Sequence, residues 1–450
     1  MPSRTTVSVA PQVRETSITI NTYDYEPALV ATQSDDPAYP YPRLDPNRIG
    51  PPSPRSYRAL VLENRYVELT ILPELGGRLY RWIDKASGKN MFYQNPVIKP
   101  TSWGYRGWWL ATGGMEWALP VEEHGLSEAS PWSVAVVPCC GKGVDRRDGL
   151  AASVSVSNVE AHSGLVCTVT IRLDAEHAYF TLQPQITNPT SATVRYKFWL
   201  NGMFGLGAQH SGPGIQFVLP ITQVVVHSTG DDALPGAGEL MSWPVYQTRD
   251  LSDYGAWRKY LGIFAYPAAA ANFMGATNHH TQLGVVRVFP HQVVRGAKVF
   301  APGDIDPAVW TDDGSGYFEL WGGLAPTFRD KVALAPGRSV RWQEYWYEVN
   351  GMGGFGYAND QAALDLKIIT STVEVAAAVT APVSGRVALY HNGVEAATWP
   401  ASLTPGQAFR ERYRLPGGRA AGEWEMVLFG DAGRRVAALK QTGTNDRIAP

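Results

Sequence analysis

The 450-residue sequence predicts an all-β protein, with a large antiparallel β-sandwich followed by a small one. Gly and Pro, with 45 and 33 copies, interrupt the chain every few residues and leave little room for long helices. The chain is also rich in Trp and Tyr, with 15 and 21 copies, and aromatic residues favour strands. Many segments alternate apolar and polar residues, which is typical of antiparallel strands with one buried face.

Strands are predicted along most of the first 360 residues. Residues 1–55 hold one alternating stretch, TSITINTY, and a proline-rich segment that we expect to wrap over the surface as extended chain. From Tyr57 onward, hairpin turns are expected at Glu63–Asn64 and at SGKN. Alternating runs from residue 151 and shorter apolar runs further on complete a large sandwich over residues 56–360.

A change in composition near Asn359 marks a second unit, residues 361–450. Its strands and turns recur at roughly 8–12-residue spacing, as in an immunoglobulin-like sandwich. Hairpin turns are expected at Asn392–Gly393 and at Asp431–Gly433. The unit lacks the clustered acids of an active site, so we interpret it as a packing or orienting module.

Composition and charge exclude several classes of protein. A formal net charge of −2 gives no basic field for nucleic acid. No run of about 18 apolar residues exists, so no membrane span is predicted. The N-terminus lacks the apolar core of a signal peptide, and three cysteines make neither a disulfide framework nor a zinc spacing. We therefore expect a cytoplasmic protein, although secretion with a removed signal stays open.

The stretch GGMEWALPVEEHG, residues 113–125, holds the first candidate catalytic residues. Glu116 is flanked by Met and Trp, and a carboxylate in an apolar setting has to be paired or functional. His124 follows eight residues later, so the two side chains converge only if the loop folds back. We interpret Glu122 and Glu123 as solvated loop residues.

The strand GYFELWGG holds another candidate, Glu319. Alternation places Tyr317, Glu319 and Trp321 on one face of this strand. Two rings beside a carboxylate suit a sugar, because rings stack on its C–H face while the acid binds hydroxyls or moves a proton. The alternative is a buried ion pair between Glu319 and Arg329 or Arg341.

Two further strands combine rings with polar groups. YKFWLNGMF places Lys197, Trp199 and Asn201 on one face, giving a cation, a ring and an amide. WQEYWYEV, residues 342–349, alternates in the same way, but a late strand that closes a sandwich needs aromatic residues in the core. We therefore assign residues 342–349 to the core.

Several motifs together resemble the galactose-mutarotase-like superfamily. They are LPELGGRLYRWIDKASGKNMFY (72–93), GGMEW, NPTSATVRYKFWLNGMF, RGAKVFAPG, YFELWGG and LAPGRSVRWQEYWYEVNGMGG. The similarity spans residues 20 to 360 and is to a poorly characterised, carbohydrate-associated branch whose domains are sometimes fused to helical repeats. The resemblance implies a β-supersandwich whose concave face binds a saccharide.

The resemblance also assigns roles to residues. Mutarotases of this superfamily use a His as acid and a late Glu as base, and Glu319 is the position that resembles the base. The strand expected to carry the His has Phe198, Trp199 and Asn201 instead. His210, further along the chain, could replace it only if its loop folds back. This departure argues against simple aldose epimerisation.

We predict a carbohydrate-active enzyme that hydrolyses glycosides, with Glu116 and Glu319 as the acid/base pair and His124 assisting. The residues expected to bind the saccharide are Trp103, Trp108, Trp109, Lys197, Trp199, Asn201, His210, Tyr317, Trp321 and Arg78. The alternatives are an aldose-1-epimerase-like isomerase, a lyase and a non-catalytic carbohydrate-binding protein. A saccharide is the expected partner; no cofactor and no catalytic metal are expected, while a structural calcium ion and a homo-oligomer stay open.

Overall fold

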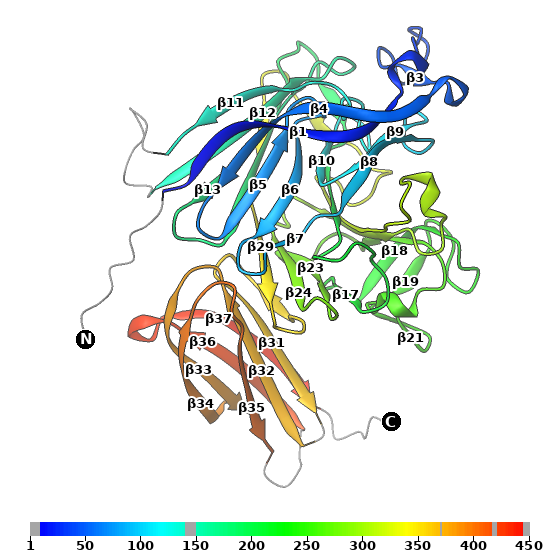
Figure 1. Cartoon of the computed structure of the whole chain (residues 1–450). Helices are drawn as coiled ribbons and strands as arrows, with labels where there is room; N and C mark the ends of the chain where they lie inside the picture. Colours follow the sequence, from blue (N-terminus) through cyan, green and yellow to red (C-terminus); the bar gives the residue numbers. More distant parts are fainter. Residues whose placement is uncertain (1–9, 140–149, 370, 416–420, 444–450) are drawn as a thin grey trace.

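The computed structural model describes residues 10–139, 150–369, 371–415 and 421–443 (Figure 1). Strands make up nearly all of its regular structure, so the prediction of an all-β protein is confirmed. The helices in these ranges are 3₁₀ helices of three residues: η1 (Glu26–Ala28), η2 (Pro46–Arg48), η4 (Tyr254–Ala256), η5 (Pro307–Val309) and η7 (Asp431–Gly433). Within the same ranges, no helix has the length and apolar character needed to cross a bilayer.

The body of the chain is a sandwich of two large sheets. The first has 14 strands, in the spatial order β19 (Leu240–Ser242), β18 (Gln223–Thr229), β22 (Leu261–Ala265), β25 (Gly296–Ala301), β26 (Phe318–Gly323), β16 (Trp199–Phe204), β10 (Met115–Ala118), β6 (Arg78–Asp84), β5 (Val67–Leu72), β4 (Gly50–Glu63), β1 (Gln12–Asp24), β8 (Gln94–Thr101) and β9 (Trp109–Gly113), with β7 (Lys89–Asn90) beside β6. The second has nine, in the order β11 (Ser133–Val137), β12 (Ala151–Val159), β13 (Val166–Asp174), β14 (Tyr179–Thr187), β29 (Glu344–Asn350), β24 (Leu283–Val288), β23 (Phe273–Asn278) and β17 (Ile215–Val218), with β28 (Ser339–Arg341) beside β14. Three short pairs complete the body: β2 (Leu29–Val30) with β3 (Arg43–Leu44), β15 (Val194–Tyr196) with β27 (Val332–Leu334), and β20 (Val245–Tyr246) with β21 (Arg249–Asp250).

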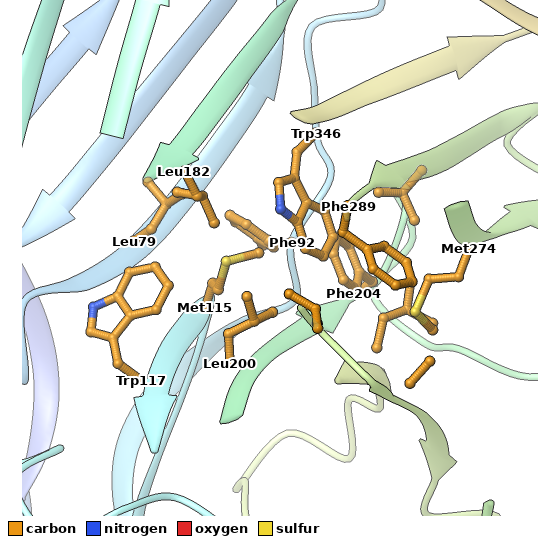
Figure 2. Close-up of a cluster of buried hydrophobic side chains, with 14 of the residues drawn as sticks. Leu79, Phe92, Met115, Trp117, Leu182, Leu200, Phe204, Met274, Phe289 and Trp346 are labelled. Atoms are coloured by element: carbon orange, nitrogen blue, oxygen red, sulfur yellow. The ribbon is translucent and has the colours of Figure 1, made fainter. Parts of the chain in front are cut away.

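The inner faces of these two sheets enclose one hydrophobic core, part of which is drawn in Figure 2. Met115 and Leu200 enter it from β10 and β16 of the first sheet, and Leu182 and Trp346 enter it from β14 and β29 of the second. Full burial of one such side chain contributes about 1.5–3 kcal/mol. Because side chains alternate along a strand, the residues next to Met115 on β10 and next to Leu200 on β16 point to the opposite, outer face of the first sheet.

The N-terminal segment differs from the predicted wrapping segment. β4 begins at Gly50, so the prolines at positions 51, 52 and 54 lie inside a strand that pairs with β1 along its length. β5 pairs only with the last part of β4, Leu60–Glu63, which leaves the proline-bearing half with one unpaired edge. Proline is tolerated at such an edge because its missing N–H removes no ladder hydrogen bond there. The first sheet therefore continues through residue 55.

The C-terminal residues form a separate small β-sandwich, as the sequence predicts, drawn in orange to red in Figure 1. One sheet contains β30 (Tyr357–Ala358), β31 (Ala362–Ile369), β32 (Thr372–Val379) and β35 (Phe409–Arg414), and the other contains β34 (Val394–Leu403), β33 (Val383–His391), β36 (Gly422–Phe429) and β37 (Arg435–Gly443). It has its own core, which includes Leu364, Leu389 and Met426. The predicted Asn392–Gly393 turn joins β33 to β34.

A buried ion pair ties the two sheets of the body together. Arg287 of β24 donates two hydrogen bonds of 2.8 Å to Glu344 of β29, and both side chains are fully buried. Glu344 also accepts hydrogen bonds from the indoles of Trp342 and Trp346. A third hydrogen bond from Arg287, 3.1 Å long, reaches the carbonyl of Trp321 in the first sheet. Trp342, Glu344 and Trp346 are therefore buried in the core, which agrees with the interpretation of residues 342–349 as a core strand.

Replacing Glu344 with Ala should destabilise the body by about 3–5 kcal/mol, because Arg287 would keep a buried charge without its partner. The free energy of unfolding, measured by urea titration with Trp fluorescence, checks this expectation. Arg386→Ala is the control, since it removes an exposed ion pair with Glu395 in the small sandwich and should leave the unfolding midpoint unchanged. Equal shifts in the two variants would contradict the role given to Arg287 and Glu344.

Candidate functional site

Side chains from five neighbouring strands form a row on the outer face of the first sheet. The strand register places Glu116 opposite Asn201 and Asn201 opposite Trp321. The same register places Trp321 opposite Lys298 and Lys298 opposite Phe264. Directly opposed residues point to the same face of a sheet. Five residues distant in sequence are therefore brought side by side across β10, β16, β26, β25 and β22.

A cleft of about 490 Å³ opens over part of this row. Tyr317, Glu319 and Trp321 line it together, which agrees with the alternation predicted for this strand. Trp103 and His124 line it from two loops. A concave space of this size, with several rings and a few polar groups, is typical of a small-molecule site.

The loop after β10 carries Glu123 and His124 into the cleft. Glu123, His124 and Gly125 have φ angles of 46°, 63° and 63°, a left-handed conformation that costs each non-glycine residue about 1–3 kcal/mol. A Cβ added at Gly125 would lie 2.9 Å from backbone atoms of Ala118 and Leu119, so glycine allows the loop to close back onto β10. Backbone strain of this kind concentrates at functional sites.

Glu116 and His124 form a buried ion pair. Nδ1 of His124 donates to Oε1 of Glu116 over 2.6 Å, and Arg78 donates to Oε2 over 2.8 Å. Burial opposes the charge on Glu116, but His124 and Arg78 outweigh it and hold the pKa of Glu116 at about 2. Burial also acts to lower the pKa of His124, yet the Glu116 carboxylate raises it above its ordinary value of 6.5. The pair thus keeps the imidazole protonated and orients it.

Trp109 fixes the plane of the His124 ring. The two rings stack with centroids 3.9 Å apart and an interplanar angle of 6°. A protonated imidazole on an indole face gains a cation–π attraction of about 0.5–2 kcal/mol. Within the described part of the chain, Nε2 of His124 has no hydrogen-bond partner, and the residue lines the cleft. This nitrogen is therefore the one available to a ligand.

Glu319 is another ionisable group of the cleft. Its Oε2 accepts a 2.7 Å hydrogen bond from the Trp321 indole, and its Oε1 accepts one of 3.3 Å from the Asn201 amide. The same Asn201 nitrogen donates to Glu116 over 3.2 Å, so one amide lies between the two carboxylates. Burial raises the pKa of Glu319 above its ordinary value of 4.5. A carboxylate of this kind is a stronger base than an ordinary one.

Glu123, His227 and Lys298 also line the cleft. His227 occupies a β-bulge in β18, a feature that redirects a side chain, and its Nε2 donates to Glu123 over 2.9 Å. Burial opposes the charge on Glu123, but His227 and Lys298 bring the pKa of Glu123 to about 2. Lys298 is buried with its Nζ 4.5 Å from the centroid of the Trp321 ring, and burial lowers its pKa. The cleft thus holds one ionised carboxylate, Glu123, and one with a raised pKa, Glu319.

The structure brings some predicted site residues together and separates others. The cleft is lined by Trp103, His124, Tyr317, Glu319 and Trp321, and the side chains buried next to these are Arg78, Trp109, Glu116 and Asn201. Lys197 lines a neighbouring cavity, and Trp199 packs edge-on against Phe264 and Phe328. Trp108 packs in a different apolar cluster, and His210 is exposed on the loop after β16. Glu319 bonds to Trp321 and Asn201 rather than to Arg329 or Arg341.

The sequence interpretation misses several residues of the cleft, among them Glu123, His227 and Lys298. Glu123 is not a solvated loop residue, because the left-handed turn directs it toward His227. The sequence did indicate Lys298 as a candidate site residue, since it is the one charged residue in the apolar strand GAKVFA. It gave no such indication for His227, because the bulge that places it depends on pairing between distant strands.

The cleft contains groups that are able to donate and accept protons. His124 offers a proton donor, and Glu319 offers an acceptor, on one aromatic-lined surface. Among the residues that the structure describes, no group of three or more His, Cys, Asp or Glu side chains is arranged to hold a metal ion.

Comparison with known proteins agrees with this architecture. Residues 33–349 match the family described as a domain of unknown function (DUF5107), and the chain belongs to that family. Residues 357–438 match the second domain of YphG-like proteins.

Solved structures resemble the chain at low sequence identity. A TPR-domain containing protein from Parabacteroides distasonis is 22% identical over 76% of this chain, with a TM-score of 0.64, and this chain spans 56% of that protein. A galactose mutarotase related enzyme from Lactobacillus acidophilus is 10% identical over 65% of this chain and 98% of its own, with a TM-score of 0.45. A galactose mutarotase-like protein from Clostridium acetobutylicum is 12% identical over 65% of this chain and 96% of its own, with a TM-score of 0.42.

Substituting Glu116→Gln should lower the pKa of His124 by about 1–3 pH units, because the opposite charge beside the imidazole is lost. An NMR titration of the histidine ring nitrogens measures this change directly. Glu123→Gln is the matched control, because Glu123 contributes less than Glu116 to the raised pKa of His124. A His124 titration that is unchanged in Glu116→Gln would show that Glu116 does not hold the proton on the ring.

Proposed function

We propose that this chain is a carbohydrate-active enzyme that transfers protons at the anomeric centre of a saccharide, with Glu319 as base and His124 as acid. This is the chemistry of an aldose 1-epimerase. The observation that carries the proposal is that these two ionisable side chains line one aromatic cleft. Glu116, predicted as one member of the acid/base pair of a hydrolase, has Arg78 on one oxygen and His124 on the other, so we assign it a positioning role.

The proposed reaction opens and recloses the sugar ring. Glu319 takes the proton from the anomeric hydroxyl while His124 gives a proton to the ring oxygen, so that the C1–O5 bond breaks and a C1 carbonyl forms. Rotation about the C1–C2 bond and the reverse proton transfers then give the other anomer. The raised pKa of Glu319 and the proton held on His124 by Glu116 both favour this direction of transfer.

The other side chains of the cleft suit a sugar. Trp103, Tyr317 and Trp321 offer rings on which the C–H face of a pyranose can stack. Lys298 supplies a buried cation for which the described residues provide no hydrogen-bond acceptor, so a sugar hydroxyl can take that place. In the superfamily that the sequence resembles, the late Glu is the base, which supports the role proposed for Glu319.

Glycoside hydrolysis is the second candidate, and Glu123 is the observation that favours it. A glycosidase needs one protonated and one ionised carboxyl group beside the scissile bond. Two carboxyl groups of the cleft differ in pKa in this way, because the pKa of Glu319 is raised and that of Glu123 is about 2. In that reaction Glu319 protonates the leaving oxygen, and Glu123 acts as nucleophile or base.

The two candidates are separated by their products. Proton NMR of freshly dissolved α-D-glucose and α-D-galactose follows anomer interconversion, and a panel of nitrophenyl glycosides reports hydrolysis. We expect accelerated interconversion that falls about 10²–10⁴-fold in Glu319→Gln and in His124→Asn. Glu176→Gln, an exposed position outside the cleft, is the control.

Other outcomes would replace the proposal. Hydrolysis that is lost in Glu123→Gln, without interconversion of free sugars, would establish the second candidate. Saccharide binding that survives Glu319→Gln, without turnover in either assay, would make the chain a non-catalytic carbohydrate-binding protein.

Interconversion should follow a bell-shaped pH profile. The base Glu319 has to be ionised, so the acid limb should lie above pH 4.5, because burial raises its pKa. The acid His124 has to be protonated, so the basic limb should lie above pH 6.5, because Glu116 raises its pKa. In Glu116→Gln the basic limb should move to lower pH. A basic limb that stays in place would contradict the assignment of His124 as the acid.

A further inference from the structure

A second cavity adjoins the cleft on the outer face of the first sheet. Its volume is about 590 Å³, and it shares Glu123 and His227 with the cleft. Both cavities also border β18, where the bulge directs His227 between them. One ligand can therefore extend from the cleft into the second cavity without leaving the protein surface.

The second cavity presents aromatic rings. Tyr266, Phe264 and Phe328 line it, and Tyr266 is 38% exposed. Phe264 and Phe328 are buried and meet edge-on with centroids 5.0 Å apart, so Tyr266 is the exposed ring of the three. An exposed ring at a concave site suits the apolar C–H face of a sugar.

The same cavity presents polar groups that lack partners. Oε2 of Glu122 is buried and has no hydrogen-bond partner, while its Oε1 holds Lys197 at 2.6 Å. The exposed Arg329 side chain packs over Gly238, where an added Cβ would lie 2.6 Å from Nη1, and its guanidinium, open to solvent, donates to no described residue. A buried acceptor without a donor is costly unless a ligand or water supplies one. Sugar hydroxyls can satisfy both the acceptor and the guanidinium donors.

We infer that the cleft and the second cavity form one groove and that the substrate is a saccharide of at least two linked residues. The inference rests on the proposed function, because it places the reacting residue in the cleft beside Glu319. The next sugar unit of the saccharide then lies in the second cavity, stacked on Tyr266 and hydrogen-bonded to Arg329 and Glu122. A free monosaccharide fills only the cleft and leaves the polar groups of the second cavity without partners.

Calorimetric titration of the full chain with a matched sugar panel tests this inference. The panel contains glucose and galactose against cellobiose, maltose and lactose. At least one disaccharide should bind at least about tenfold more tightly than its component monosaccharides. Arg329→Ala and Tyr266→Ala should each remove most of that gain while leaving monosaccharide affinity unchanged. Arg338→Ala, an exposed arginine outside both cavities, is the control.

The outcomes separate the two proposals. Monosaccharides that bind and turn over as well as every disaccharide, with no effect of Arg329→Ala or Tyr266→Ala, would overturn the extended groove but leave the proposed function intact. A panel in which no sugar binds and none is turned over would overturn both. A loss of monosaccharide affinity in Arg329→Ala would also contradict the inference, because it would show that a single sugar binds in the second cavity.

Discussion

The geometry of the cleft depends on one buried carboxylate, Glu116. Burying the charges of Arg78 and protonated His124 is costly without a counter-ion, and Glu116 binds one of these cations on each of its oxygens, while Glu128 also lies 3.6 Å from Arg78. Arg78 is anchored in turn by the carbonyl of Gly113, at the start of the same short strand. The imidazole is therefore fixed in position and charge before any ligand arrives. A loop in an unfavourable left-handed conformation is retained because this ion pair and the Trp109 stack hold it.

The rest of the site follows from the register of one sheet. Glu116, Lys298 and Trp321 lie far apart in sequence but share a face of the sheet. They do so because β10, β16, β26 and β25 pair with no register shift. A one-residue slip would move each of these side chains into the core. The two irregular features near the row, the β18 bulge and the loop after β10, each deliver a cleft residue, His227 and His124. Residues on regularly paired strands thus line the base of the cleft, and residues on a bulge and a loop line its sides.

Local pattern explains which parts of this structure could be predicted from the sequence. Period-two alternation indicated the strands and placed Glu319 with its two flanking rings, because both depend only on neighbouring residues. The proline-bearing start of β4 was missed, since its strand conformation depends on pairing with β1 across a long loop. Glu123 and His227 were missed for a similar reason: a left-handed turn and a bulge decide where they point. Pattern also could not show that Trp108 lies in a separate cluster.

We propose that Glu319 and His124 act on the same anomeric centre. A crystal structure of the Glu319→Gln variant, soaked with a saccharide that binds in solution, would show whether they do. We expect the anomeric oxygen within hydrogen-bonding distance of the side chain at position 319 and the ring oxygen facing Nε2 of His124, with a sugar face on Trp321 or Trp103. A saccharide bound elsewhere on the chain, with the cleft empty at saturation, would contradict the claim.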